Sequence, residues 1–233
     1  MTPEELSAAA HSLLTFNAPM SLPRARRLIE HLAAQPGERV LDLGCGWGEL
    51  LISLVSSAPG VTGDGIDSSR HAIERGRRAA PSSVRLHVGD AGEWDEPADI
   101  VLCIGSSHAF GGTAGALAAV RRLLRPGGRA LVGEGLWAKL PDPAALRGLG
   151  GATEDELTDL RGLLALAGGS GLSVIHFELA DQDEWDDFET RWCDGLHQTG
   201  IPEAIAAADE HQHGYLHGYR GTLGFAYLIC TQK

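Results

Sequence analysis

Short apolar runs alternate with helix-like segments along the middle of the chain. Five such runs, at residues 39–43, 61–66, 84–88, 100–104 and 129–132, each have the length of a strand. Alternation of this kind is typical of a parallel sheet, because a right-handed crossover places a helix between successive strands. Two more runs, at 172–179 and 223–230, predict further strands. The pattern therefore indicates an α/β fold.

Helical patterns dominate the remaining parts of the chain. Residues 2–14 and 23–34 predict two helices with a break at Asn17-Ala18-Pro19. Residues 141–166 predict a helical insertion or connection, and an alanine-rich segment near 202–212 predicts another helix. Trp185, Phe188 and Trp192 recur at helical spacing in an acidic stretch, which favours an amphipathic helix with these residues in its core face.

An acidic residue and three glycines mark the end of the first predicted strand. After Asp42, the glycines at 44, 46 and 48 follow a GxGxG spacing. Glycines allow a tight turn and let a ligand lie against the main chain. A dinucleotide loop would instead keep GxGxxG, with a helix N-terminus facing the phosphates. Glu49 at the start of the next helix would repel a diphosphate yet tolerate a zwitterionic or cationic ligand.

Further carboxylates close the second and third predicted strands. Asp67 follows Gly65-Ile66, where a carboxylate can accept hydrogen bonds from both hydroxyls of a ribose. Asp90 follows the third strand, where its side chain can accept from an exocyclic amine. Asp64, by contrast, is interpreted as a strand or loop residue. Ligands of an open parallel sheet bind beyond the carboxyl ends of its strands, so we expect a nucleotide-type cofactor there.

Residues 38–133 resemble the class I S-adenosylmethionine-dependent methyltransferases. The resemblance lies in VLDLGCGWG, GIDSS, HVGDAGEW, ADIVLCIGSSHAF and LLRPGGRALVGEG, in that order. It implies that Asp42 and the 44–48 backbone hold the methionine end of S-adenosylmethionine, that Asp67 holds the ribose and Asp90 with Ala91 the adenine edge, and that S-adenosylhomocysteine is the product. The cofactor-binding residues that we expect are Asp42, Gly44, Cys45, Gly46, Gly48, Asp67, Ser68, Asp90, Ala91, Trp94, Ile104 and Gly105; for Trp94, an exposed helix face is an equal alternative.

The same resemblance implies a Rossmann-like, doubly wound sheet of seven strands. The sheet would be mostly parallel, with an antiparallel last strand inserted between the fifth and the sixth. We expect one methyltransferase domain over residues 1–233, in which residues 1–36 form an N-terminal helical cap, 37–135 the cofactor-binding core, and 136–233 the substrate-side insertions, which complete the cap, and the last two strands.

Two residues beyond strand ends are the catalytic candidates. Methyl transfer to a hydroxyl or a protonated amine needs a group that removes a proton near neutral pH. His108 follows the fourth strand and is the first choice, although it could instead cap the next helix. Glu134, at the end of the fifth strand, could hold an amine or balance the departing cation, and a structural hydrogen bond is the alternative.

Apart from His108, the acceptor-binding candidates lie outside residues 38–133, which carry the resemblance. Besides His108 they are Phe16, Met20, Trp137, His213, Tyr219 and Arg220. The histidine-rich run at 211–217 could gather a metal, but we expect no metal because the run itself contains no acidic or cysteine partner. For the same run, a solvated helix end in which Tyr219 and Arg220 anchor the last strand remains an alternative to a substrate loop.

The charge and composition of the chain limit the classes of partner that it is expected to bind. Nineteen basic against thirty-one acidic residues give a net charge of −12, which disfavours nucleic acid and anionic membrane surfaces. No apolar run is long enough to span a membrane and the first ten residues do not resemble a secretory signal, so we expect a soluble, cytoplasmic enzyme. The four cysteines are scattered and are expected to be buried thiols.

The expected function is methyl transfer from S-adenosylmethionine to an oxygen, nitrogen or sulfur atom of a small-molecule acceptor. The alternatives are non-methylating chemistry, such as cyclisation, on the same cofactor, and a silent cofactor-binding module. The sequence is compatible with a homo-oligomer but does not fix the oligomeric state.

Overall fold

The computed structural model describes residues 1–233, which form two compact units. The larger unit contains Ser21–Glu134, Leu163–Glu178 and Ala226–Lys233, and the smaller unit contains Met1–Met20, Gly135–Gly162 and Leu179–Phe225. The segment that begins at Ser21 therefore belongs to the larger unit. Of the predicted N-terminal cap at residues 1–36, only the first twenty residues belong to the smaller unit.

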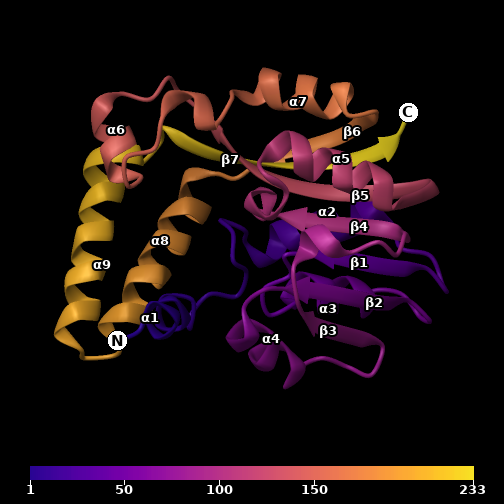
Figure 1. Cartoon of the computed structure of the whole chain (residues 1–233), viewed down its shortest axis with the longest axis horizontal. Coiled ribbons are helices and arrows are strands. Elements are labelled where there is room, and N and C mark those ends of the chain that lie inside the picture. The colour runs from indigo at the N-terminus through magenta and orange to yellow at the C-terminus, as the bar shows by residue number, and fades with distance from the viewer. The chain divides into compact units, whose positions relative to one another are not determined.

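A seven-stranded sheet runs through the larger unit (Figure 1). Its strands are β1 (Arg39–Leu43), β2 (Thr62–Asp67), β3 (Val84–Val88), β4 (Ala98–Ile104), β5 (Leu124–Trp137), β6 (Leu172–Leu179) and β7 (Leu223–Gln232). Their order in the sheet is β3-β2-β1-β4-β5-β7-β6, and β7 is antiparallel. This is the doubly wound arrangement that the sequence predicted, with the last strand inserted between the fifth and the sixth.

Helices of the larger unit cover the sheet where the sequence places small or apolar residues. They are α2 (Leu22–Leu32), α3 (Glu49–Val55), α4 (Arg70–Arg77), the 3-10 turns η1 (Ala91–Glu93) and η2 (Ser107–Phe110), α5 (Thr113–Leu123) and, from Leu163 onward, α7 (Leu160–Gly169). The side chains of Leu51 and Val55 on α3 lie so close to Gly63 of β2 that a Cβ there would come within 3 Å of each. Glycine on β2 thus lets α3 approach the sheet.

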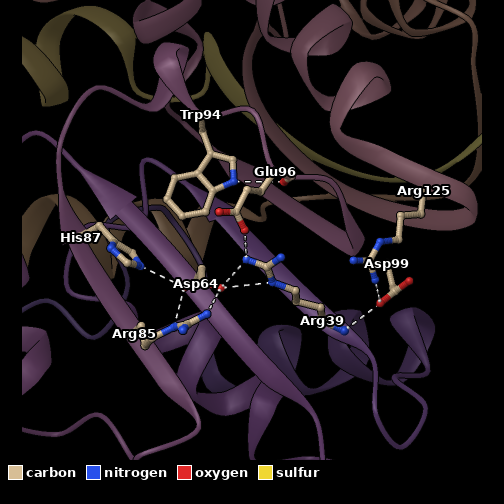
Figure 2. Close-up of polar contacts among 8 residues, drawn as sticks. All are labelled: Arg39, Asp64, Arg85, His87, Trp94, Glu96, Asp99 and Arg125. Atoms are coloured by element: carbon tan, nitrogen blue, oxygen red, sulfur yellow. Dashed lines mark hydrogen bonds and ion pairs between the residues drawn. The ribbon is translucent and has the colours of Figure 1, made fainter.

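The opposite face of β2 is polar. Side chains alternate along a strand, so Asp64 points away from α3. Its carboxylate, with 4% of the side chain exposed, accepts hydrogen bonds from Arg39 of β1 and from Arg85 and His87 of β3 at 2.9–3.3 Å (Figure 2). The connection from β3 to β4 contains only the short turn η1, so no α-helix of that crossover covers this cluster. Burial alone would raise the pKa of Asp64, but hydrogen bonds from Arg85, His87 and Arg39 outweigh it and hold the pKa below its usual value.

Helices make up the smaller unit. They are α1 (Pro3–Ala10), α6 (Pro143–Gly148), the 3-10 turn η3 (Glu154–Glu156), α8 (Gln182–His197), α9 (Pro202–Gly214) and the π-helical turn η4 (Tyr215–Tyr219). A small apolar core joins α1, α8 and α9 through Ala10, Cys193, Leu196, Ala204 and Ala208. A Cβ on Gly195 of α8 would lie 2.3 Å from the carbonyl oxygen of Ala9, so glycine is what permits this crossing.

Most strand limits follow the sequence pattern closely, but the helix predicted at 2–14 ends at Ala10, and the fifth strand, predicted at 129–132, continues to Trp137. The fifth strand starts at Leu124 rather than Arg129, because Ala98 already pairs with Leu124 and a register shift before Ile100 absorbs the Pro126-Gly127-Gly128 segment. No helix of the structure is both long and apolar enough to cross a bilayer.

Candidate cofactor site

The strand register brings the predicted cofactor residues to one edge of the sheet. Leu43 of β1 lies level with Ile66 of β2 and with Cys103 of β4. The next residue on each strand therefore lies at the same edge: Gly44, Asp67 and Ile104. Because these are the carboxyl ends of parallel strands, this edge is where an α/β sheet binds ligands.

The glycine loop is folded as its spacing predicts. Gly44, Gly46 and Gly48 have φ values of 70°, 55° and 75°, in the left-handed region that other residues enter at a cost. The amides of Gly44 and Cys45 both donate to the Ile66 carbonyl oxygen, at 2.9 and 3.0 Å. The amide of Gly48 donates to the Cys45 carbonyl oxygen at 2.8 Å. These bonds hold the loop in one compact turn over the end of β2.

Two glycines of this loop have different surroundings. A Cβ on Gly44 would lie 2.3 Å from the Cβ of Ser106, which leaves no room for a side chain. A Cβ on Gly46 would meet no atom within 4 Å. The space beside Gly46 is therefore open, and a ligand can lie against the main chain there.

Asp67 ties the end of β2 to this loop. Its Oδ2 accepts from the Gly46 amide and its Oδ1 from the Ser69 amide, both at 2.8 Å. An ionised carboxylate offers about four acceptor positions, so each oxygen keeps one for another donor. Asp67 thus remains able to accept from a pair of hydroxyl groups, as the resemblance implied.

Asp42 is a buried carboxyl group that receives no hydrogen bond from the protein. It lies on β1, two residues before Gly44, with 4% of its surface exposed. Burial, and then the charge of Asp67, raise its pKa to about 7. A buried polar group without a protein partner is costly unless a water, an ion or a ligand supplies the hydrogen bond. A cationic amino group, like that of a methionine moiety, would supply the missing donor.

Asp90 and Ala91 form the start of η1. The Oδ1 of Asp90 accepts from the Gly92 amide at 2.8 Å, which fixes the side chain and leaves Oδ2 without a bond in the protein. Ala91 is the first residue of this helical turn, where an amide N–H has no intrahelical partner. One acceptor and one donor at this turn match the polar edge of an adenine ring.

Trp94 lies on the polar side of β2 and β3. Its ring is 5.3 Å from that of His87, and its Nε1 donates to the Glu96 carbonyl oxygen at 3.0 Å (Figure 2). Trp94 follows η1 and has extended backbone rather than a helix-face position. Its packing on adenine stays a prediction.

Three further residues predicted to bind the cofactor lie around the loop. Cys45 is half-buried, and burial together with the charges of Asp42 and Asp67 raises the pKa of its thiol well above normal. It is therefore a neutral thiol and not a nucleophile. Ser68 is exposed. Gly105 has a φ of 63°, and its amide donates to the Gly133 carbonyl oxygen at 2.9 Å, which joins the residue after β4 to β5.

Ser106 supports the loop, and sequence reasoning missed it. Its buried Oγ donates to the Leu43 carbonyl oxygen at 2.7 Å and lies 3.2 Å from the Cys103 sulfur. The side chain fills the space that a side chain at position 44 would need. Leu43 and Ser106 are 63 residues apart in the sequence, so no local pattern announces this contact.

Of the two catalytic candidates, His108 lies beyond the end of β4, but the prediction that Glu134 closes the fifth strand is wrong, because β5 continues to Trp137. His108 is on η2, is exposed, and its ring makes no hydrogen bond to another protein group. Glu134 is buried, with 7% exposed, and follows Gly133, which pairs with Ile104. Both residues belong to the larger unit, which also carries the glycine loop.

The acceptor candidates other than His108 belong to the smaller unit. There Phe16 is buried and Met20 half-buried. The Nε1 of Trp137 donates to the Glu154 carbonyl oxygen at 2.8 Å. Arg220 donates two hydrogen bonds, at 2.7 and 2.9 Å, to the carboxylate of Asp186.

Tyr219 and His211 share a buried carboxylate that the sequence did not reveal. Glu189 accepts from the Tyr219 hydroxyl at 2.9 Å and lies 2.5 Å from His211 Nε2. Trp192 stacks on His211 with ring centroids 4.0 Å apart. These rings line a hollow of about 670 Å³, and His213 is exposed at its rim. Glu189 and His211 come together only because α8 and α9 pack side by side.

One group of side chains in the larger unit has metal-ligating chemistry. Atoms of His31, His176 and Glu178 lie within 4.8 Å of one another. However, Arg24 and Arg27 already donate to Glu178 Oε2 at 2.6 and 2.9 Å. These two guanidinium groups would repel an added cation.

Comparisons with known proteins agree with this geometry. A family model described as a methyltransferase domain matches residues 41–130. The uncharacterised protein YjhP of Escherichia coli (strain K12) is 37% identical over 171 residues, covering 69% of this chain and 68% of YjhP. The 27-O-demethylrifamycin SV methyltransferase of Amycolatopsis mediterranei is 27% identical over 224 residues, covering 89% of this chain and 81% of that protein.

A solved structure shares almost the whole fold. It is an S-adenosylmethionine-dependent methyltransferase from Geobacter sulfurreducens in complex with S-adenosyl-L-homocysteine, with a TM-score of 0.90, 28% identity and 98% coverage of each chain. The predicted cofactor, S-adenosylmethionine, is thereby confirmed. The strand order, the glycine loop with its carboxylates and these similarities lead to one conclusion: the chain belongs to the class I S-adenosylmethionine-dependent methyltransferases.

Proposed function

We propose that this enzyme methylates a hydroxyl oxygen of a small organic molecule, with His108 as the general base. The relative from Amycolatopsis mediterranei methylates, by its name, an O-demethylated small molecule. The observation that carries the proposal for this chain is the exposed, unbonded imidazole of His108 just past β4. β4 pairs with β1, whose end forms the glycine loop.

In the proposed reaction, the cofactor supplies the methyl group and the protein removes the proton of the acceptor. When bound, S-adenosylmethionine supplies an electrophilic methyl group on its sulfonium. A hydroxyl group becomes a competent nucleophile when it loses its proton, and a neutral imidazole accepts a proton near neutral pH. His108 therefore takes the hydroxyl proton on a ring nitrogen. Alignment of donor and acceptor supplies much of the remaining rate enhancement.

Glu134 has a second role in this proposal. Glu134 is a buried carboxylate on β5, next to Gly133, which pairs with Ile104, and a carboxylate at this position can accept a hydrogen bond from the acceptor. Glu134 then orients the acceptor rather than removing its proton. Under this assignment, Glu134→Gln raises KM by about tenfold or more and changes kcat less, because a hydrogen bond to a charged group is worth about 1.5–3 kcal/mol.

The direct test is a methyl-transfer assay with a panel of hydroxylated small molecules. Purified enzyme with S-adenosylmethionine should release one S-adenosylhomocysteine per methylated product. His108→Gln should lower kcat about 10²- to 10⁴-fold and leave the Kd for S-adenosylhomocysteine unchanged. His71→Gln is the matched control, because His71 is an exposed histidine on α4 of the same unit.

Two outcomes would contradict the proposal. Full activity of His108→Gln would exclude the base assignment. Turnover without S-adenosylhomocysteine release would favour the alternative, non-methylating chemistry on the same cofactor.

Acceptor selectivity is proposed to depend on residues of the smaller unit. Trp137, Tyr219 and Arg220 are the positions to test first, since their anchored side chains offer fixed surfaces. Substitution of Trp137 by Phe should change the ranking of acceptors in the panel without changing affinity for S-adenosylhomocysteine. An unchanged ranking would remove Trp137 from the acceptor site.

A further inference from the structure

One edge of the sheet has no partner. β6 is the last strand in the order β3-β2-β1-β4-β5-β7-β6 (Figure 1). Apart from the ladder with β7, no backbone group of residues 173–179 bonds to another segment of the chain. An unpaired edge presents a row of free amide and carbonyl groups, which can template pairing with another strand.

The side chains of β6 are unusual for such an edge. Ile175, Phe177 and Leu179 share one face and are 61%, 44% and 44% exposed. Between them, His176 and Glu178 lie on the other face. Natural proteins protect free edges with charged residues, proline or bulges, but this strand has an apolar stripe along its exposed face. A stripe of this kind on a free edge indicates a surface that is covered by a partner.

We propose that the partner is a second copy of this chain, paired through antiparallel β6 strands about a two-fold axis at Phe177. Edge-to-edge pairing would join the two sheets into one continuous sheet. A two-fold interface brings the same surface from both copies together, so the strand must be complementary to its own reverse.

The sequence of β6 has that property. With the axis at Phe177, Ile175 lies opposite Leu179 of the other copy, and Phe177 lies opposite Phe177. On the other face, His176 lies opposite Glu178 at each end, a pair of complementary polarity, while Glu178 keeps the hydrogen bonds from Arg24 and Arg27 of its own chain. Directly opposed aromatic, apolar and complementary charged pairs are the interactions that stabilise antiparallel strands.

Neighbouring registers are worse for physical reasons. A shift of one residue along one strand would place apolar side chains opposite polar ones on both faces. An axis at Glu178 would place two carboxylates opposite each other, and an axis at His176 would oppose two imidazoles and leave Glu178 facing Val174. Only the axis at Phe177 places apolar side chains opposite each other on one face and His176 opposite Glu178 on the other.

The pairing would leave the cofactor loop free. β6 is separated from β1 by β4, β5 and β7 in the sheet, so both copies could bind S-adenosylmethionine independently. Changes in β6 that prevent pairing should therefore leave the affinity for S-adenosylhomocysteine unaltered. Cofactor affinity is thus a readout that separates loss of pairing from loss of folding.

Sedimentation velocity over a range of protein concentrations tests the proposal. The wild-type protein should sediment as a dimer that dissociates on dilution. Phe177→Glu opposes two carboxylates at the axis and removes an aromatic pair, so it should raise the dimer Kd by about tenfold or more. Leu216→Glu is the matched control, because Leu216 is an exposed leucine, 54% accessible, on η4 of the smaller unit. It should leave the dimer intact.

A residue on the axis also allows a positional test. In Phe177→Cys, two copies of the new thiol would lie opposite each other, and a short bis-maleimide should join them into a covalent dimer. Mass spectrometry should identify the 177–177 cross-link. Leu216→Cys should give no such product.

Three outcomes would overturn the proposal: a monomeric wild type at all concentrations, a Phe177→Glu variant that dimerises like wild type, or cross-links that do not involve position 177. Circular dichroism and S-adenosylhomocysteine binding on each variant show that a loss of dimer does not come from unfolding.

Discussion

Asp42 and Asp67 are neighbouring carboxyl groups at the ends of β1 and β2, and burial followed by the charge of Asp67 raises the pKa of Asp42 to about 7. Asp67 is satisfied by two backbone amides, whereas Asp42 receives no hydrogen bond from the protein. The loop therefore carries one carboxylate that shapes the site and another whose charge is costly until a ligand arrives. This division has consequences for both stability and binding.

Stability of the cofactor-free protein should fall as the pH rises from about 4 to about 7. The folded pKa of Asp42, about 7, lies above the usual value of 3.8, so the folded state holds this proton more tightly than the unfolded state. The resulting stability is complete below about pH 4 and is lost as the pH rises to about 7. In thermal melts of Asp42→Asn this contribution to the pH dependence should be absent. Parallel Tm profiles for the two proteins would contradict the assignment.

Cofactor binding should have the opposite pH dependence. A cationic amino group binds the ionised form of Asp42, so the affinity for S-adenosylhomocysteine should increase as the pH rises from 6 to 8. Asp42→Asn should weaken binding about tenfold or more, because a hydrogen bond to a charged group is worth about 1.5–3 kcal/mol. Isothermal titration calorimetry at both pH values measures this. An Asn variant that binds as tightly as wild type at pH 8 would exclude contact between Asp42 and the ligand.

Two glycine substitutions in the loop should have different effects. Gly44→Ala places a Cβ 2.3 Å from that of Ser106, so it should cost several kcal/mol of stability and lower Tm strongly. Gly46→Ala meets open space and should cost only about 1 kcal/mol for its left-handed backbone, yet its methyl group would enter the space beside the loop and weaken S-adenosylhomocysteine binding. Thermal melts and calorimetry on the same two proteins compare both effects. Equal Tm losses would contradict this difference.

The polar cluster around Asp64 should contribute measurably to stability. Asp64→Ala leaves His87 without its carboxylate and Arg39 with Glu96 alone. Removing one partner from a buried ion pair costs about 3 kcal/mol, and we expect less here because Glu96 still pairs with Arg39 and Arg85 is mostly solvated. Urea denaturation should show a clear loss. Asp187→Ala is the control, because Asp187 forms an exposed pair with Arg191 one helical turn away and should change stability by less than about 0.5 kcal/mol. A loss no larger than in this control would show that the cluster is only a surface feature.

Much of the fold could be predicted because its signals are local. The limits of β1, β3 and β6 match the predicted ranges, since each is a short run bounded by glycine, proline or polar residues. The antiparallel position of β7 came from the family resemblance and is confirmed. The π-helical turn η4 has no comparable sequence signal and was not predicted.

The candidate site likewise contains residues that local sequence signals predicted and residues that they did not. Glycines and carboxylates at strand ends are visible in the sequence, because strand ends are predictable and parallel strands share one edge. Ser106 and the Glu189–His211 contact were missed because each depends on packing between segments far apart in the chain. Asp64 was assigned to a strand or loop, but its cationic partners on β1 and β3 become evident only from the register, in which Asp64 pairs with Arg85.

Because of this strand register, the residues at positions 39, 64 and 85 are expected to change together during evolution. A helix over the β3–β4 crossover would allow apolar residues at 39, 64 and 85, but here the carboxylate of Asp64 lies between Arg39 and Arg85 and bonds to both. Loss of the acid alone would leave two like charges side by side. Homologues that lack an acidic residue at position 64 are therefore expected to have replaced both arginines as well, and an alignment of the family would show the three columns changing together.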